Sequence, residues 1–150
     1  MIEARTSIEI DRPPADVFAF VSEVPNNPRW QRGQRECRWT SSPPLRVGSS
    51  YEQHARFLGR DLVNSFRVIE LDAGARVKFT STAGTFPLTI TRIVEPLGDS
   101  RARFTEHVAG DPRGVYRIAE PLLRRMVKHT IKRDFPRLKA LLEASQPDAR

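Results

Sequence analysis

The sequence is 150 residues long, which suits one domain, and we expect residues 1–150 to form a single domain. Its one cysteine excludes an intrachain disulfide, no apolar run could span a membrane, and no signal-peptide core is present, so we expect a cytoplasmic protein. The net charge of +7 lies almost wholly in residues 112–150, where ten Lys or Arg residues outnumber four acidic ones. This basic excess fits an acidic partner, a membrane surface or nucleic acid, or simply the solvated face of an amphipathic helix.

The N-terminal residues predict one strand followed by short helical segments. Residues 2–10 alternate between apolar and polar side chains, which is the pattern of a half-buried strand. Pro13 and Pro14 end that strand and suit the first turn of a helix, and residues 15–24 have helical apolar spacing. Residues 25–28 then break the helix.

The middle of the chain predicts a meander of antiparallel strands. Turn residues recur at regular spacing between short segments that are rich in strand-forming residues. The predicted strands are residues 36–40, 50–58, 62–71, 76–82, 86–95 and 101–108, and the last two form a hairpin.

The last third predicts a long amphipathic helix. Apolar residues recur at spacings of three and four from Val115 onward, with basic residues between them. The predicted apolar stripe is Val115, Ile118, Leu122, Met126, Val127, Ile131, Phe135, Leu138 and Leu142. Pro121 and Pro136 lie inside this pattern, and we expect each to bend or interrupt the helix.

This order of elements resembles the START/Bet v 1-like (SRPBCC) superfamily, and in particular its polyketide cyclase/dehydrase and lipid-transport group. The residues that carry the resemblance are Pro13–Phe18, Asn27-Pro28-Arg29-Trp30, Val47-Gly48, Gly59-Arg60, residues 95–100 and the helix end at Leu138–Glu143. The usual Gly-Thr after the hairpin turn is replaced here by Ser100-Arg101-Ala102.

The resemblance implies an α+β helix-grip fold. In that fold a curved antiparallel sheet of about seven strands surrounds a long C-terminal helix, and two short helices follow the first strand. It also implies a cavity between the sheet and the helix, which in this superfamily binds lipids, polyketides, sterols or plant hormones. A minority of members catalyse cyclisation or dehydration, so the fold alone does not assign an activity.

The hairpin makes a specific prediction about one pair of charged residues. Its turn centres near Gly98 and Asp99, and apolar residues flank the charged pair on both strands. We therefore expect an inward face with three opposed pairs: Val94 with Phe104, Arg92 with Glu106, and Ile90 with Val108. Alternatively, Arg92 and Glu106 pair in water at the margin of the sheet.

Ligand pockets have apolar walls with a few oriented polar groups. On that basis we predict a ligand site lined by Trp30, Trp39, Tyr51, Phe57, Asn64, Phe66, Phe79, Ile90, Arg92, Phe104, Glu106, Leu122 and Met126. For the two tryptophans, ordinary core packing is the alternative interpretation.

We expect no metal and no cofactor. His54, His107 and His129 have no metal-ligand spacing, Cys37 lacks a nearby second ligand, and no nucleophile-elbow or phosphate-loop motif occurs. No catalytic residue can be assigned from the sequence.

Three functions remain open at this stage. The leading hypothesis is a binding or carrier protein for a small hydrophobic ligand such as a lipid or polyketide. The second is a cyclase/dehydrase-type enzyme, with Glu106 as general base or acid and Arg92 steadying an enolate. The third is a partner-binding module that uses the basic C-terminal helix. Nucleic acid is not expected because that helix has only two aromatic residues, and the oligomeric state is left open.

Overall fold

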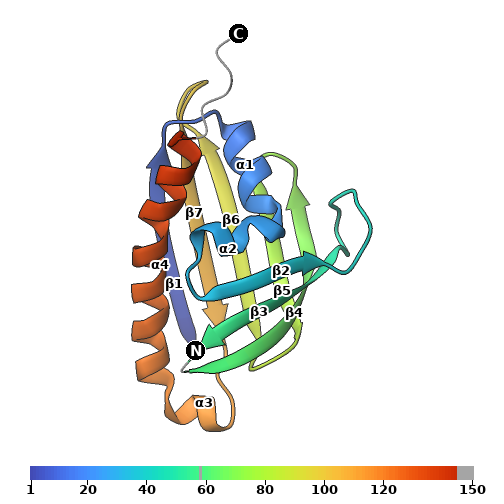
Figure 1. Ribbon diagram of the computed structural model, residues 1–150, viewed down its shortest axis with the longest axis vertical. Helices are drawn as coiled ribbons and strands as arrows, with labels where there is room; N and C mark the ends of the chain where they lie inside the picture. Colours follow the sequence, from blue (N-terminus) through green and yellow to red (C-terminus); the bar gives the residue numbers. More distant parts are fainter. Residues whose placement is uncertain (58, 145–150) are drawn as a thin grey trace.

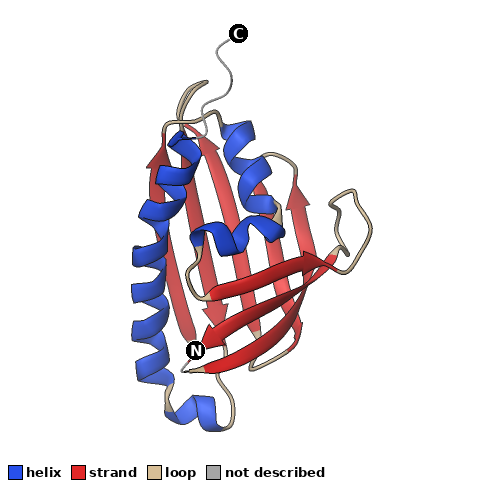
Figure 2. Cartoon of the chain, in the orientation of Figure 1, coloured by secondary structure: helices blue, strands red, loops and turns tan. Residues whose placement is uncertain are grey.

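The computed structural model describes residues 1–57 and 59–144, without the side chain of Phe57. Its centre is a seven-stranded antiparallel sheet in the order β1-β7-β6-β5-β4-β3-β2. The sheet is strongly curled, and α1, α2 and α4 lie on one side of it (Figures 1 and 2). The strands are β1 (Ile2–Ile10), β2 (Gln34–Trp39), β3 (Ser50–Phe57), β4 (Arg60–Asp72), β5 (Arg76–Ala83), β6 (Leu88–Pro96) and β7 (Ala102–Gly110). The predicted helix-grip architecture is confirmed.

Short helices connect the first two strands, as the prolines predict. They are α1 (Pro14–Ser22), a 3-10 turn η1 (Val24–Asn26) and α2 (Asn27–Trp30). Proline is tolerated in the first turn of α1 because the N–H that it lacks would have no helical partner there. Val17, Phe18 and Val21 are buried, and α1 packs against β6 and β7. These helices close one end of the inner face of the sheet.

The C-terminal segment forms α3 (Val115–Ile118) and the long α4 (Glu120–Ala144). The C-terminal half of α4 carries the predicted apolar stripe: Ile131, Phe135, Leu138 and Leu142 are at most 6% exposed. This half is the part of the helix that completes the core, and α4 packs against β1 and α2.

Two predictions about this segment are wrong. Val115, Ile118 and Leu122 are 72%, 86% and 49% exposed, whereas Leu123 is buried. The reason is the turn at Ala119, which separates α3 from α4 and shifts the buried face by one residue. Of the bend or interruption expected at Pro136, the interruption does not occur, because α4 runs through this residue. Pro121 is the second residue of α4, where a missing N–H costs little.

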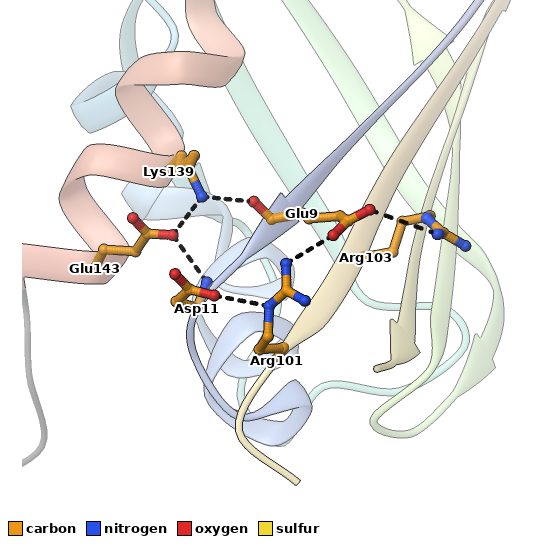
Figure 3. Close-up of polar contacts among 6 residues, drawn as sticks. All are labelled: Glu9, Asp11, Arg101, Arg103, Lys139 and Glu143. Carbon is orange, nitrogen blue, oxygen red and sulfur yellow. Dashed lines mark hydrogen bonds and ion pairs between the residues drawn. The ribbon is translucent and has the colours of Figure 1, made fainter. Parts of the chain in front are cut away.

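An ion-pair network holds the C-terminal end of α4 against the end of β1 (Figure 3). Lys139 donates from Nζ to the Glu9 carbonyl at 2.9 Å and pairs with Glu143, whose carboxylate accepts the Asp11 N–H at 2.8 Å. Arg101, the residue before β7, bonds Glu9 at 2.7 Å and Asp11 at 2.8 Å. The hydrogen bond from Lys139 lowers the pKa of Glu143, which therefore stays ionised in this network.

Candidate ligand-binding site

The centre of the candidate site is the buried ion pair between Arg92 and Glu106. Arg92 on β6 lies directly opposite Glu106 on β7, in the register expected from the hairpin turn. The side chains are 2% and 4% exposed, and Arg92 Nε donates to Glu106 Oε2 at 2.8 Å. The predicted inward, cross-strand pair is confirmed, and the alternative of a solvated pair at the sheet margin is wrong.

Arg92 has further partners that come from the short helices. Its Nη1 donates to the Val21 carbonyl at 2.9 Å and to Asn27 Oδ1 at 2.8 Å. The guanidinium also lies over the rings of Trp30 and Phe79, at 5.1 and 6.0 Å from their centroids. Carbonyl dipoles and aromatic faces both stabilise a cation, so the charge of Arg92 is well compensated although it is buried.

Asn27 extends this pair into a polar network that the sequence analysis did not assign to the site. Its Nδ2 lies 3.7 Å from Cys37 Sγ, and the thiol in turn lies 3.8 Å from Gln53 Oε1. Burial raises the pKa of Cys37 to about 11, against a smaller lowering by the Asn27 contact, so the thiol is protonated at neutral pH. The network therefore runs from β7 through β6, α2 and β2 to β3.

Aromatic side chains form the wall beside the polar network. Tyr51 stacks on Phe66 with a centroid distance of 5.1 Å and meets Phe79 edge-on at 5.2 Å. Trp30 contacts Phe104 edge-on at 6.1 Å. Burial raises the pKa of the Tyr51 hydroxyl, against a smaller lowering by the charge of Arg92. Tyr51 is therefore a neutral hydrogen-bonding group in an apolar wall.

The ion pair lies at a boundary within the inner face of the sheet. On one side of it, Val94 and Phe104 are at most 2% exposed and belong to the sealed core. On the other side, Ile90, Val108 and Leu88 are only half-buried, although they share the inward face. The side of the pair toward Gly110 is thus apolar and accessible.

Several polar groups near this boundary are not used by the protein itself. The Trp30 indole Nε1 is buried and has no hydrogen-bond partner. The Tyr51 hydroxyl, Arg92 Nη2 and Glu106 Oε1 likewise make no hydrogen bond to any residue within 1–57 or 59–144. Buried polar groups in folded proteins are almost always satisfied, so the Trp30 indole is an exception, and all four groups have hydrogen-bonding capacity left for an oxygen-bearing molecule.

The other predicted site residues are distributed as follows. Trp39 is half-buried and its indole donates to Glu23 at the edge of the sheet. Asn64 is buried, but its Oδ1 accepts the Thr85 N–H at 3.0 Å and so fastens the loop between β5 and β6. Met126 is half-buried on α4. Leu122 is exposed, as described above, and the Phe57 side chain lies outside the described residues.

Two hollows on the described part of the molecule lie away from the inner face of the sheet. One of about 790 Å³ lies around Arg117, Ile118 and Pro121, beside α3. The other, of about 340 Å³, lies on the outer face around Thr91 and His107. In the described part of the chain, no three His, Cys, Asp or Glu side chains gather as metal ligands would. Within residues 1–57 and 59–144, no helix is both long and apolar enough to cross a bilayer.

Comparisons with solved structures support the fold assignment. The chain superimposes on a protein from Thermus thermophilus with a TM-score of 0.82 and 15% identity, covering 97% of this chain and 99% of that one. A START superfamily protein from Mycobacterium smegmatis gives a TM-score of 0.82 and 12% identity, covering 96% and 99%. The Zhui aromatase/cyclase from Streptomyces sp. R1128 gives 0.73 and 9%, covering 95% and 91%.

At these identities the likeness concerns the fold alone, and a search of curated proteins gave no match. Sequence-family comparison is more specific. The family model described as polyketide cyclase / dehydrase and lipid transport matches residues 1–143, which is nearly the whole chain. The curled sheet, the helix grip and this match agree: the chain belongs to the polyketide cyclase/dehydrase and lipid-transport family.

Proposed function

We propose that this protein binds or carries a small hydrophobic molecule that bears a carbonyl or hydroxyl oxygen. The observation that carries this proposal is the position of the Arg92–Glu106 pair, between a sealed aromatic core and an accessible apolar patch. The apolar part of a ligand would lie against Leu88, Ile90 and Val108. Its oxygen would meet the unused donors of Arg92 and Tyr51.

The chemistry of the ionisable groups favours binding over catalysis. A general base works best with a pKa near the working pH. The thiol of Cys37 has a pKa of about 11 and the pKa of the Tyr51 hydroxyl is also raised, so neither group is ionised near neutral pH. Glu106 Oε2 already accepts the Arg92 Nε–H at 2.8 Å, so the carboxylate is engaged in a structural ion pair. The cyclase/dehydrase alternative therefore has less support, despite the similarity of the fold to an aromatase/cyclase.

Native mass spectrometry of freshly purified protein tests this proposal directly. We expect a retained small molecule of a few hundred daltons, which denaturation releases and which accurate mass then identifies. In parallel, the neutral fluorescent probe Nile red should bind with micromolar affinity and be displaced by fatty acids, sterols or aromatic polyketides. If no molecule is retained and Nile red does not bind, the proposal is wrong. If a displacing polyketide loses water during incubation, the protein is an enzyme instead.

A matched pair of tyrosine variants tests the polar anchor. Tyr51→Phe removes only the inward hydroxyl and should weaken an oxygen-bearing ligand by about three- to tenfold, the usual net worth of one hydrogen bond. Tyr116→Phe is the control, because Tyr116 lies on α3 with its ring packed on Phe86 and makes no contact with Arg92 or Glu106 among the described residues. Equal affinities for the two variants would show that Tyr51 does not contact the ligand.

A further inference from the structure

Exposed apolar side chains gather at one end of the molecule. Val115, Ile118 and Leu122 are 72%, 86% and 49% exposed, and they come from α3 and the first turn of α4. Figure 1 shows α3 projecting at the end of the molecule opposite α1. Exposed apolar side chains that cluster on a protein surface generally mark a site of contact with a partner or a membrane.

Unpaired cations lie on the same two helices as these apolar side chains. Arg117, Arg125, Lys128 and Lys132 are all exposed, and none forms an ion pair within the described residues. The nearby acidic residues do not offset them, because Asp111 pairs with Arg113 and Glu120 with Arg124. We call the surface made by Val115, Ile118, Leu122, Arg117, Arg125, Lys128 and Lys132 the basic tip.

The backbone holds this arrangement in place. Gly114 precedes α3 with a φ of 62°, a left-handed conformation that favours glycine. The Tyr116 ring packs on Phe86 with a centroid distance of 5.3 Å, so α3 is fixed with Tyr116 turned toward the protein. On α4, Leu122, Arg125 and Lys132 follow one another at helical spacing along one exposed face. The apolar and basic groups are thus presented together.

We propose that the basic tip docks on the surface of an anionic lipid bilayer. Branched apolar side chains that enter the headgroup region, flanked by lysine and arginine, are the combination that binds such interfaces. A second copy of the chain fits less well, because two basic tips would repel each other. Nucleic acid also fits less well, since the one aromatic residue of α3, Tyr116, is engaged with Phe86.

The tip lies at the accessible end of the candidate ligand site. Leu88 pairs with Gly110 at the end of β7, and α3 begins five residues later, at Val115. Docking would therefore bring the apolar inner patch close to the bilayer, from which a hydrophobic molecule could enter. Membrane docking itself needs no ligand, so this proposal and the proposed function can fail separately.

Vesicle flotation of the full chain tests the proposal. We expect binding to vesicles of phosphatidylcholine with 30% phosphatidylserine, little binding to phosphatidylcholine alone, and loss of binding in 0.5 M salt. Arg125→Gln with Lys128→Gln should weaken binding by about thirtyfold, because each basic residue near the surface contributes about a factor of five. Arg5→Gln with Arg67→Gln is the control: it removes the same charge from two exposed arginines on β1 and β4 that form no ion pair with any residue of 1–57 or 59–144.

The apolar contribution needs its own pair of variants. Ile118→Ser should weaken binding by about tenfold or more, whereas Ile69→Ser, at a 40% exposed site on β4, should not. A polarity-sensitive fluorophore on Ile118→Cys should shift to shorter wavelength with anionic vesicles, while one on Ile69→Cys should not. Absence of vesicle binding would overturn the proposal, and so would equal losses in the tip and control variants. Capture of an acidic protein without any vesicle binding would assign the tip to a protein partner instead.

Discussion

Removal of the Glu106 carboxylate gives the most direct test of how the interior is held together. In Glu106→Ala, Arg92 loses the acceptor that lies 2.8 Å from its Nε, while its side chain stays 2% exposed. Stranding one member of a buried ion pair typically costs about 3–5 kcal/mol. Arg92 keeps the Val21 carbonyl, Asn27 Oδ1 and the Trp30 ring as partners, so we expect a loss near the lower limit, about 3 kcal/mol.

Glu106→Gln separates charge from hydrogen bonding. The amide oxygen can still accept from Arg92 Nε, but a neutral acceptor stabilises a cation less, and the expected loss is about 1 kcal/mol. Both variants should fold, since domains of this kind have stabilities of about 5–15 kcal/mol. Ligand preference should nevertheless change in Glu106→Gln, because the anchor becomes an amide.

Urea denaturation followed by circular dichroism measures these differences. The matched control is Glu70→Ala, which removes a 51% exposed carboxylate lying 3.3 Å from Arg76 and should cost at most about 0.5 kcal/mol. If Glu106→Ala is no more destabilising than Glu70→Ala, the Arg92–Glu106 pair is solvated and cannot be a buried anchor.

Three further measurements address other parts of the fold. Leu123 is 1% exposed and Leu122 is 49% exposed, so in urea denaturation Leu123→Ala should cost about 2–5 kcal/mol and Leu122→Ala under about 0.5 kcal/mol. If Leu122→Ala is the more destabilising variant, Leu122 lies on the buried face of α4, as expected from the sequence. Burial raises the pKa of the Cys37 thiol from 9.0 to about 11, so this thiol should react with Ellman's reagent at pH 8 only after the protein unfolds. The thiol's contribution to the free energy of unfolding is full below about pH 9 and is lost as the pH rises toward 11, and Cys37→Ala should not show this loss. Glu143→Gln should lower the melting temperature slightly at pH 7. Because the pKa of Glu143 is lowered in the folded state, the difference in melting temperature from wild type should vanish as the pH falls below about 4. A difference that persists at pH 2 would contradict this cause.

The sequence predicted the sheet and its central ion pair because strands have a strict period of two. Once the turn of the β6–β7 hairpin is located, the partner and face of Arg92 follow from counting. Tyr51 and Gln53 are two residues apart on β3, so the same period places them on one face, and both are buried.

The remainder of the polar network could not be found in this way. Asn27 and Cys37 belong to α2 and β2, and their meeting with Arg92 depends on how these elements pack. Asn27 belongs to the Asn27–Trp30 segment that carries part of the family resemblance, but no periodicity in the sequence marks its side chain as inward. The helix error at Leu122 has a similar origin, since the apolar spacing continues across Ala119 although the helix does not.

The uneven anchoring of α4 has a consequence for its motions. Five side chains from Ile131 onward are buried, and the contacts of Figure 3 fasten this end, whereas before Ile131 only Leu123 is buried. Local opening is easiest where few apolar groups are buried. Amide hydrogen exchange should therefore be fast before Ile131 and slow after it, within one continuous helix. The N-terminal half is therefore the part of α4 that should open most readily, and it carries Leu122, Arg125 and Lys128 of the basic tip.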